Sequence, residues 1–439
     1  MKRICSAALL AALTLTAGAQ SDSDSNVSYS GTNSPYSQYG LGELADPSGG
    51  FSRGMNGLGL AFREHNQVNP LNPASYSAVD SLSFIFDIGV NGSITNFKEG
   101  GKKVNASNAD FDYVTAAFRA CRHVGVSFGL LPYSNVGYKY SANGYMNTDR
   151  LVSYTNTYRG SGGLHQVYLG AGWEVLKNLS LGANVSYMWG NIERAVTNEY
   201  SDASVNTLRK YYMATVNNYK LDFGVQYTYP LNKKDQLTVA LTYSPGHKLG
   251  TDPECRIMSV NSNTSVTDTT TYSVSNGLKL PDTFGAGVNY NHNNQLKLGL
   301  DYQMQCWSKV GFPVNKVSGS KQTYKIDGDY FSDRQKITFG GQYCKDEYGR
   351  SFFSRMRYRF GASYTTPYLN INGQDGPKEF SVSAGLGIPI VNSWNNRSIL
   401  NISAQWVNQS ASGLVDANTF RINIGLTFNE RWFAKWKVE

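Results

Sequence analysis

Charged residues are scarce in this sequence of 439 residues. Asp, Glu, Lys and Arg together make up 16% of it, against roughly 25% in an average soluble domain. The formal net charge of +8 is mild and scattered, which argues against a nucleic-acid-binding protein. After the first residues, no uncharged apolar run approaches the roughly 18 residues that a membrane-spanning helix needs. These absences exclude a helical membrane protein.

Cysteine and histidine are also rare, with five of each. Four cysteines lie beyond the N-terminal leader, far apart and without a C-x-x-C pair, so we expect free thiols: Cys121, Cys255, Cys306 and Cys344. The histidines show no metal-ligand spacing to one another, to cysteine or to carboxylates. The glycine-rich stretches open no helix, which argues against phosphate binding. We therefore expect no metal, no cofactor and no catalytic residue, and the chain is not predicted to be an enzyme.

The chain begins with the pattern of a secretory signal peptide. Lys2 and Arg3 precede a short apolar stretch at 4–16, and Ala-Gly-Ala follows at 17–19. This pattern predicts a signal peptide over residues 1–19 and an exported protein. No cysteine follows the cleavage site, which argues against a lipid anchor.

Strict alternation of apolar and polar residues dominates the sequence from residue 81. In "SLSFIFDIGVNGSI" every second residue from Leu82 to Val90 is apolar, as in a strand with two different faces. The pattern recurs to residue 428, and several runs end on Tyr, Trp or Phe, as an interfacial aromatic girdle requires. We count about fourteen strands, an even number that places both termini on the periplasmic side. In the second strand, Phe111 and Tyr113 fall out of phase with Val114, which predicts a β-bulge.

The connections between these strands fall into two length classes. Short polar turns near 176, 232 and 292 alternate with long Ser/Thr/Asn-rich segments at 195–215, 250–278 and 311–333. Short periplasmic turns and long external loops are typical of an outer-membrane barrel. A secreted β-sandwich would have shorter strands and no reason to sort its turns by length. The predicted fold is all-β: a transmembrane antiparallel β-barrel over residues 81–428.

The residues on either side of the predicted barrel do not alternate. Residues 20–80 are too long for a simple tail and contain enough glycine and apolar residues to pack inside a lumen, so we predict a hatch, or plug. Residues 429–439 follow the final strand and are predicted to form a periplasmic tail, with aromatic residues near the membrane interface.

Two segments of the predicted hatch carry a family resemblance. "SRGMNGLGLAF" followed by "NPLNPASYS" resembles the N-terminal hatch of the FadL family, which includes the TodX-type transporters. That family transports long-chain fatty acids and other hydrophobic compounds across the outer membrane. Its Asn-Pro-Ala motif corresponds to Asn72, Pro73 and Ala74. "FGLLPYSNVGY", "GSGGLHQVYLGAGW" and "FNERWFAKWKVE" are similar to versions of the family in Bacteroidetes-type bacteria.

The resemblance implies a route for a hydrophobic small molecule. In FadL-like transporters the hatch blocks the lumen, and the substrate leaves sideways into the membrane lipid. It passes through a gap made by a kink in the third strand, next to the Asn-Pro-Ala segment. The third strand counted here, "VGVSFGLLPYSNVGYKY", contains Pro132, which cannot donate to a β-ladder. Pro132 and Tyr133 are therefore the candidate lateral opening.

Three arginines at alternate positions form a candidate anion site. If Met356 and Phe360 face lipid, then Arg355, Arg357 and Arg359 all face the lumen, where they could bind an anionic head group. The alternative is a structural role, in which they pair with three inward-facing aspartates: Asp87, Asp222 and Asp301.

The predicted function is uptake of long-chain fatty acids or other hydrophobic small molecules, and a non-transporting barrel is the alternative. Uptake requires a continuous apolar pocket from the external loops to Pro132. The non-transporting barrel would be FadL-like and would act in type IX protein secretion or as a scaffold subunit of an outer-membrane complex. Such a barrel would have a filled lumen and would bind other outer-membrane or periplasmic proteins. The sequence names neither a substrate nor an oligomeric state.

Overall fold

The computed structural model describes most of the chain beyond its first thirty residues. The described residues are 31–146, 152–261, 263–318, 321–371, 373–390, 398–430 and 432. The predicted signal peptide and most of the predicted C-terminal tail lie outside them. Among the described residues, no helix is long and apolar enough to cross a membrane.

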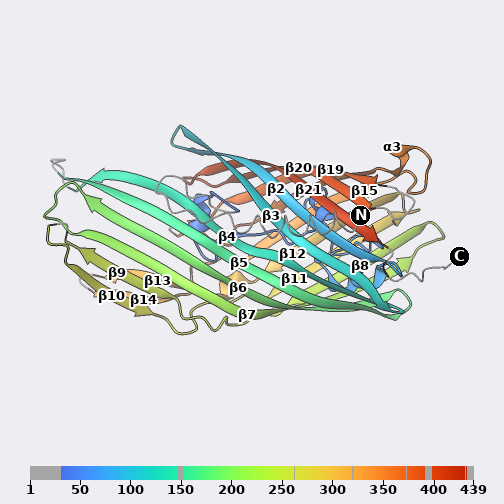
Figure 1. The fold of residues 1–439 in the computed structure, drawn as a ribbon, viewed down its shortest axis with the longest axis horizontal. Coiled ribbons are helices and arrows are strands. Elements are labelled where there is room, and N and C mark those ends of the chain that lie inside the picture. Colours follow the sequence, from blue (N-terminus) through green and yellow to red (C-terminus); the bar gives the residue numbers. More distant parts are fainter. Residues whose placement is uncertain are drawn as a thin grey trace.

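The described strands build one closed antiparallel barrel (Figure 1). Seventeen strands share a sheet; three of them, β1, β9 and β10, lie outside the closed circuit, so the wall has fourteen strands. β2 pairs with β21 and closes the circle. The wall strands are β2 (Phe84–Glu99), β3 (Lys102–Cys121), β4 (Val124–Tyr145), β5 (Ser153–Leu176), β6 (Leu179–Tyr200), β7 (Thr207–Pro230), β8 (Asp235–Ser244), β11 (Thr283–His292), β12 (Leu296–Gln305), β15 (Arg334–Tyr343), β16 (Arg357–Thr365), β19 (Lys378–Ile390), β20 (Ser398–Ser410) and β21 (Asp416–Glu430). The predicted fold class and strand number are confirmed.

The two faces of the wall differ as the alternation predicts. Leu169 and Val185 are 61% and 59% exposed on the outside, whereas Ser186 and Gln226 are buried inside. An apolar exterior around a polar interior is the inverse of a soluble β-protein, and it is the arrangement that a bilayer requires of a barrel.

The two ends of the barrel also differ. We call "turn end" the end where β2 begins and β21 finishes, and where short connections join β5 to β6 and β11 to β12. We call the opposite end "loop end". There, the prediction of a long loop at 195–215 is wrong, because β6 continues to Tyr200 and β7 begins at Thr207. Thr and Val are common in this stretch and favour an extended strand.

The other two long loops contain strands of their own, beyond the ends of the shorter wall strands (Figure 1). β9 (Glu254–Val260) pairs with β7, β10 (Thr267–Ser273) pairs with β9, and β13 (Phe312–Ser318) forms a hairpin with β14 (Lys321–Asp327). The remaining short elements are η3 (Trp307–Lys309), α3 (Phe352–Arg355), β17 (Asn370–Ile371) and β18 (Gln374–Asp375).

The predicted bulge in the second wall strand is confirmed. Val90 pairs with Phe111 and Gly89 with Tyr113, so Asp112 is the extra residue. The ring of Tyr113 lies over Gly89, where a Cβ would come closer than 3.0 Å to it. The bulge therefore turns both Asp112 and Tyr113 into the lumen, where they are buried.

Residues 31–83, which we call the N-terminal segment, lie within the barrel (Figure 1). Their elements are η1 (Pro35–Gln38), β1 (Glu43–Leu44), α2 (Gly50–Arg53) and η2 (Pro73–Ala78). Phe51, Met55, Leu58 and Phe62 form a buried cluster at its centre. The segment thus has an apolar core of its own and packs as a folded unit.

Candidate functional site

The third wall strand, β4, separates from its neighbour β3 partway along the wall. Their ladder runs from Cys121 and Val124 at the turn end to Val114 and Leu130. Beyond Leu130, β4 continues to pair with β5, and β3 continues to pair with β2. Figure 1 shows the β2–β3 hairpin diverging from the ends of β4 to β7. We call this opening between β3 and β4 the wall gap.

Pro132 stands at the start of the wall gap. It is opposite His165 of β5, and the register shifts between Pro132 and Ser134, which leaves Tyr133 as the extra residue of a bulge. Because proline has no N–H, it cannot donate to a neighbouring strand. The structure thus places both predicted residues of the lateral opening where the β3–β4 ladder has ended. Their role in the passage of a molecule stays a prediction.

The N-terminal segment supplies a short strand on the β4 side of the wall gap. In β1, Glu43 pairs with Asn135 and Leu44 with Ser134. Next to them, the amide of Ala45 donates to the carbonyl of Tyr133 at 3.0 Å. β1 therefore pairs with the β4 edge that β3 has left.

The first described residues reach across to the β3 side. The Asn33 side-chain amide donates to Oδ1 of Asn108 on β3 at 2.6 Å, and the Thr32 hydroxyl donates to Glu43 at 2.5 Å. Gly31, in the left-handed region with φ of 91°, fits between the side chains of Asn135 and Asp110. Residues 31–45 therefore contact both sides of the wall gap from within.

The Asn-Pro-Ala motif has a clear structural role. Asn72 is buried and caps η2: its Oδ1 accepts from the Ala74 amide at 3.0 Å. Its Nδ2 donates to the carbonyl of Leu60 at 2.9 Å. One side chain therefore starts a helix and ties it to an earlier part of the N-terminal segment.

A row of glycines in the wall receives this motif, and our sequence analysis missed it. Gly125, Gly172, Gly182 and Gly224 are paired side by side across β4 to β7. A Cβ on each would come closer than 3.0 Å to residues of η2 or its cap, between Asn72 and Tyr76. The signal is visible in the sequence, because each glycine is flanked by two apolar residues that face outward: "VGV", "AGW", "LGA" and "FGV".

The motif packs against β4 at a different position from Pro132, although Tyr76 of η2 and Leu131 belong to one buried cluster. η2 rests on the glycine row near the turn end, where Gly125 belongs to β4. Pro132 lies seven positions further along that strand, or roughly 23 Å at 3.3 Å per residue. Pro73 and Pro132 nevertheless line the same lumen cavity.

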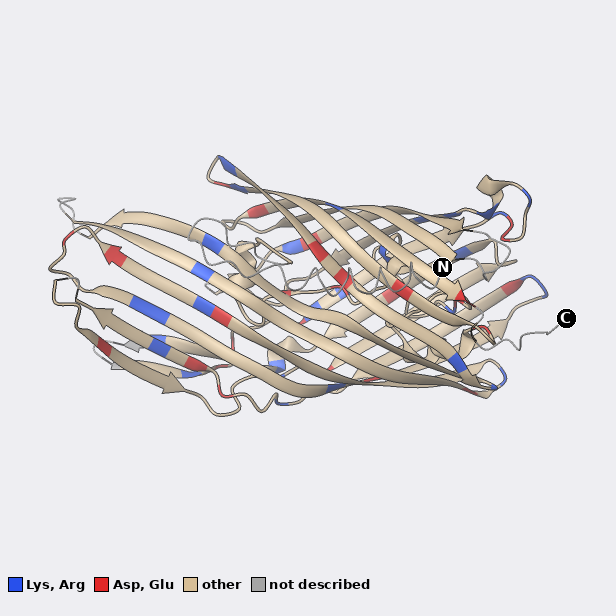
Figure 2. Ribbon diagram, viewed as in Figure 1, with Lys and Arg blue, Asp and Glu red and all other residues tan. Residues whose placement is uncertain are grey.

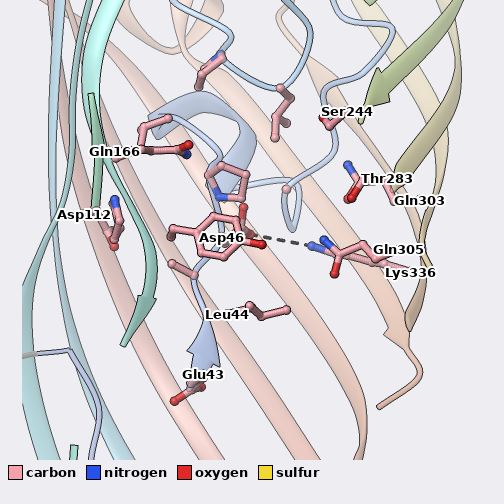
Figure 3. Close-up of a pocket in the computed structure, with 18 of the residues that line it drawn as sticks. Glu43, Leu44, Asp46, Asp112, Gln166, Ser244, Thr283, Gln303, Gln305 and Lys336 are labelled. Carbon is pink, nitrogen blue, oxygen red and sulfur yellow. Dashed lines mark ion pairs between the residues drawn. The ribbon is translucent and has the colours of Figure 1, made fainter. Parts of the chain in front are cut away.

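This cavity has both polar and apolar residues in its lining (Figure 3). It has a volume of about 250 Å³, and its lining includes Glu43, Asp46, Asp112, Gln166 and Lys336. Asp112 Oδ2 and Gln166 Oε1 are buried without a hydrogen-bond partner among the described residues. Buried polar atoms of this kind need partners, so water or a polar group at these two positions would be stabilised.

A chain of ion pairs crosses the lumen beside the cavity. The Arg53 guanidinium lies 3.3 Å from Asp112 of β3 and donates to the Asp46 carbonyl at 2.9 Å. The Asp46 carboxylate lies 3.8 Å from Lys336 of β15. Burial alone would raise the pKa of Asp46, but Lys336 and Arg53 outweigh it and lower the pKa. The N-terminal segment is therefore held between opposite walls by charges.

Two of the three predicted lumen arginines face inward. Arg357 and Arg359 are buried. Arg357 donates to Glu347 at 3.0 Å, and Arg359 donates to Gln342 at 2.8 Å and Asn401 at 2.6 Å. These contacts are with the wall and one of its turns, and neither arginine lines the lumen cavity.

The placement of Arg355 in the lumen is wrong. It belongs to α3 in the turn before β16, where it donates to the carbonyls of Gly349 and Arg350, each at 3.0 Å. Met356 is buried and does not face lipid. The alternation was extended past the end of a strand that begins at Arg357.

Among the described residues, the three aspartates suggested as partners of the arginines form no direct ion pair with them, although Asp87 interacts electrostatically with Arg359. Asp301 accepts from the amides of Gly59 and Leu60 at 2.8 and 2.9 Å. Asp87 accepts from Thr427 at 3.1 Å, and Asp222 is paired with Lys220. Asp301 therefore anchors the N-terminal segment, and Asp87 and Asp222 bond within the wall.

A large apolar cluster fills the loop end of the lumen. Its buried members are Tyr36, Leu41, Val136, Tyr138, Leu164, Met188, Ile192, Val216, Leu249, Leu278, Leu280, Trp307, Val310, Phe331, Tyr368, Leu369 and Ile371. They come from the N-terminal segment, the wall and the loops. The rings of Trp307, Phe331 and Tyr368 lie 5.0 to 5.7 Å apart. We call this set the loop-end cluster; one of its members, Leu280, also lines the lumen cavity.

Within the described residues, no group of histidine, cysteine, aspartate and glutamate side chains could hold a metal ion. The four cysteines beyond the leader are free, as expected.

The solved structures similar to this chain include hydrocarbon channels. The Pseudomonas putida toluene transporter TodX is similar with a TM-score of 0.61 at 13% identity, over 89% of this chain and 100% of that one. The Ralstonia pickettii toluene transporter TbuX gives 0.59 at 14%, over 88% and 99%. The CymD monoaromatic hydrocarbon channel gives 0.54 at 17%, over 89% and 98%. At these identities the likeness shows a shared FadL/TodX-type fold.

The sequence itself points to one family. No curated protein matches it. The sequence model of the BamG family matches residues 7–439, nearly the whole chain, and the chain therefore belongs to the BamG family.

Proposed function

We propose that this protein is a non-transporting barrel of the outer membrane that serves as a structural subunit of a multiprotein complex. The observation that carries the proposal is the filled lumen. The loop-end cluster, the N-terminal segment and the ion pairs of Arg53 occupy the path that a transported molecule would take.

Passage through this lumen would be costly for a hydrophobic molecule. It would first displace part of the loop-end cluster, where exposing each large side chain costs roughly 1.5 to 3 kcal/mol. It would then enter a cavity lined by Asp46, Asp112 and Lys336. Neither step is favourable for a hydrocarbon, whereas a rigid filled barrel suits a scaffold.

The location follows from the leader and the outer surface. An exported chain with an apolar barrel exterior belongs in the outer membrane. If the short turns are on the periplasmic side, the start of β2 and the end of β21 also lie on that side. The extensions of β6, β7, β9 and β10 then lie on the outer side of the membrane. Partners can then come from the membrane or from either side of it.

The experiment is cross-linking in intact cells that carry an affinity-tagged copy at the native level. The proposal predicts one or more outer-membrane or periplasmic proteins bound in a fixed ratio to the tagged barrel. A tagged barrel of unrelated function, at the same level, is the control. If the tagged protein is recovered without partners, as the control barrel is, the proposal is contradicted.

A second function, uptake of hydrophobic compounds, is favoured by the wall gap at the third strand. TodX and TbuX, which share the fold, are toluene transporters. In this chain, uptake requires residues 31–45 to leave the gap and the loop-end cluster to open. Equal entry of radiolabelled toluene into cells with and without the protein would exclude this function, and faster entry with it would support it.

A further inference from the structure

We propose that the open edge of β3 beside the wall gap binds an extended segment of a partner polypeptide as an added β-strand. This inference rests on the proposed function and names the kind of partner surface that the complex would use.

The edge extends over the loop-end part of β3, from Lys102 to Asp110. On one side these residues pair with β2. On the other side they have no strand partner among the described residues, because the ladder with β4 ends at Val114. Val104 is 64% exposed. The backbone N–H and C=O groups on this side are therefore open along about nine residues.

An open strand edge of this length is a binding template. Its donors and acceptors repeat at the spacing of another strand, so an extended polypeptide can satisfy several of them at once. No small molecule or lipid offers such a series. Proteins usually cover or shorten exposed edges, and here the edge is long.

The edge of β4 that faces the wall gap is covered by another part of the chain. β1 pairs with Ser134 and Asn135, and further along, the Ser37 hydroxyl bonds to both the amide and the carbonyl of Gly137 at 3.2 Å. The chain thus covers the β4 edge with its own N-terminal segment. On β3, the corresponding contacts described are to side chains: Asn33 donates to Asn108, and Gly31 lies against the side chain of Asp110.

The side chains along the edge define the chemistry of the partner segment. Lys102 and Lys103 lie at the tip of the hairpin, where Figure 2 shows basic residues beside an acidic one. Glu99 of β2 is opposite Lys102 and Lys98 is opposite Lys103, which leaves the tip with a net positive charge. Asp110 lies at the inner end. Opposite charges stabilise cross-strand neighbours. The segment should therefore carry acidic residues beside the tip, a basic residue beside Asp110, and an apolar residue between them, against exposed Val104 and half-buried Phe97.

The first test is amide hydrogen exchange on the complex isolated from native membranes, compared with the barrel freed of its partners. The inference predicts that exchange in residues 102–110 slows by about tenfold or more in the complex, as expected when open amides gain strand partners. Exchange in β20, which is paired on both sides, is the internal control. Equal rates in an intact complex would overturn the inference and leave the proposed function standing.

The second test uses charge at the tip. The double substitution Lys102→Glu, Lys103→Glu should weaken retention of the partner about tenfold, equivalent to 1.4 kcal/mol. Lys325→Glu, on the β13–β14 hairpin, is the matched control and should retain the partner. Heat-modifiable migration on gels checks that each barrel folds.

A third measurement distinguishes a partner from a second copy of the chain. In a Val104→Cys variant, a cross-link from position 104 to a different polypeptide supports the inference. A cross-link between two copies, with dimers in solution, overturns it. Absence of any complex contradicts the proposed function itself.

Discussion

Asn72 and Gly224 lie so close together that a Cβ on the glycine would come within 3.0 Å of the asparagine side chain. The contact joins the cap of η2 to the wall strand β7. It is one of four similar contacts along the glycine row, and it shows that the N-terminal segment and the wall are fitted to each other.

The close packing of the glycine row predicts that adding one methyl group to one of these glycines will strongly reduce the stability of the barrel. Gly224→Ala or Gly182→Ala should destabilise the folded barrel by about 1 to 3 kcal/mol, the usual cost of overpacking a tight contact. Gly92→Ala is the control, because nothing lies within 4 Å of its Cβ position. Thermal unfolding in detergent measures the stability of the glycine-row variant and of the control. Equal midpoints for Gly224→Ala and Gly92→Ala would mean that η2 does not dock on the wall as described.

The buried ion pairs predict that Arg53 is essential for holding the N-terminal segment. Arg53→Met leaves Asp112 buried without its cation, and breaking a buried pair in this way costs about 3 to 5 kcal/mol. Arg256→Met removes a partly exposed pair with Glu254 and should cost about 0 to 1 kcal/mol. Limited proteolysis of the N-terminal segment and unfolding midpoints would report the difference. Similar values for the two variants would contradict it.

His65 predicts a pH dependence at the turn end. It lies outside the wall strands, 2.6 Å from Asp80 and 3.7 Å from Glu347. These hydrogen bonds, first that to Asp80, raise the pKa of His65 to about 10. The unfolded value is roughly 6.5, so the stabilisation is fully present below that pH and is lost as the pH rises through about 10.

The measurement for His65 is the unfolding midpoint between pH 6 and 10.5, a window around roughly 6.5 and 10. The native protein should lose stability across this range, and His65→Gln should lose less of it. If the unfolding midpoints of the two proteins change with pH in parallel, the charged His65 does not hold the N-terminal segment to the turn that contains Glu347.

The pairing of the N-terminal segment with β4 predicts that a substitution next to β1 will loosen the backbone at the wall gap. Ala45→Pro removes the amide that donates to Tyr133, at a cost of about 1 kcal/mol. Hydrogen exchange of residues 133–135 should accelerate, while sensitivity to hydrophobic antibiotics should not change, because the loop-end cluster stays packed in the lumen. Increased sensitivity would instead favour uptake through the gap.

Much of the wall could be predicted because a lipid-facing strand must alternate. The strand from Phe84 to Val90, the bulge before Val114 and the strand containing Pro132 follow from that period alone, although Leu82, which the period includes, lies in the turn before the strand. The same rule failed at Arg355, where a turn precedes the strand. Periodicity says which face a residue has within a strand, but it does not say where the strand begins.

The closure of the wall gap could not be predicted. β1 has two residues, too few for any period, and it pairs with β4 because the fold brings it there. The loop-end cluster draws single residues such as Leu41, Trp307 and Tyr368 from distant segments. The glycine row, in contrast, could have been predicted, because each of its four glycines lies between two outward-facing apolar residues in the sequence.

The most direct measurement of the central claim is the mass of the particle released from native membranes in mild detergent. If the barrel is a structural subunit, native mass spectrometry will show the chain together with at least one other polypeptide in a fixed ratio. A particle that contains this chain alone, with a hydrophobic small molecule bound in its lumen, would contradict the account.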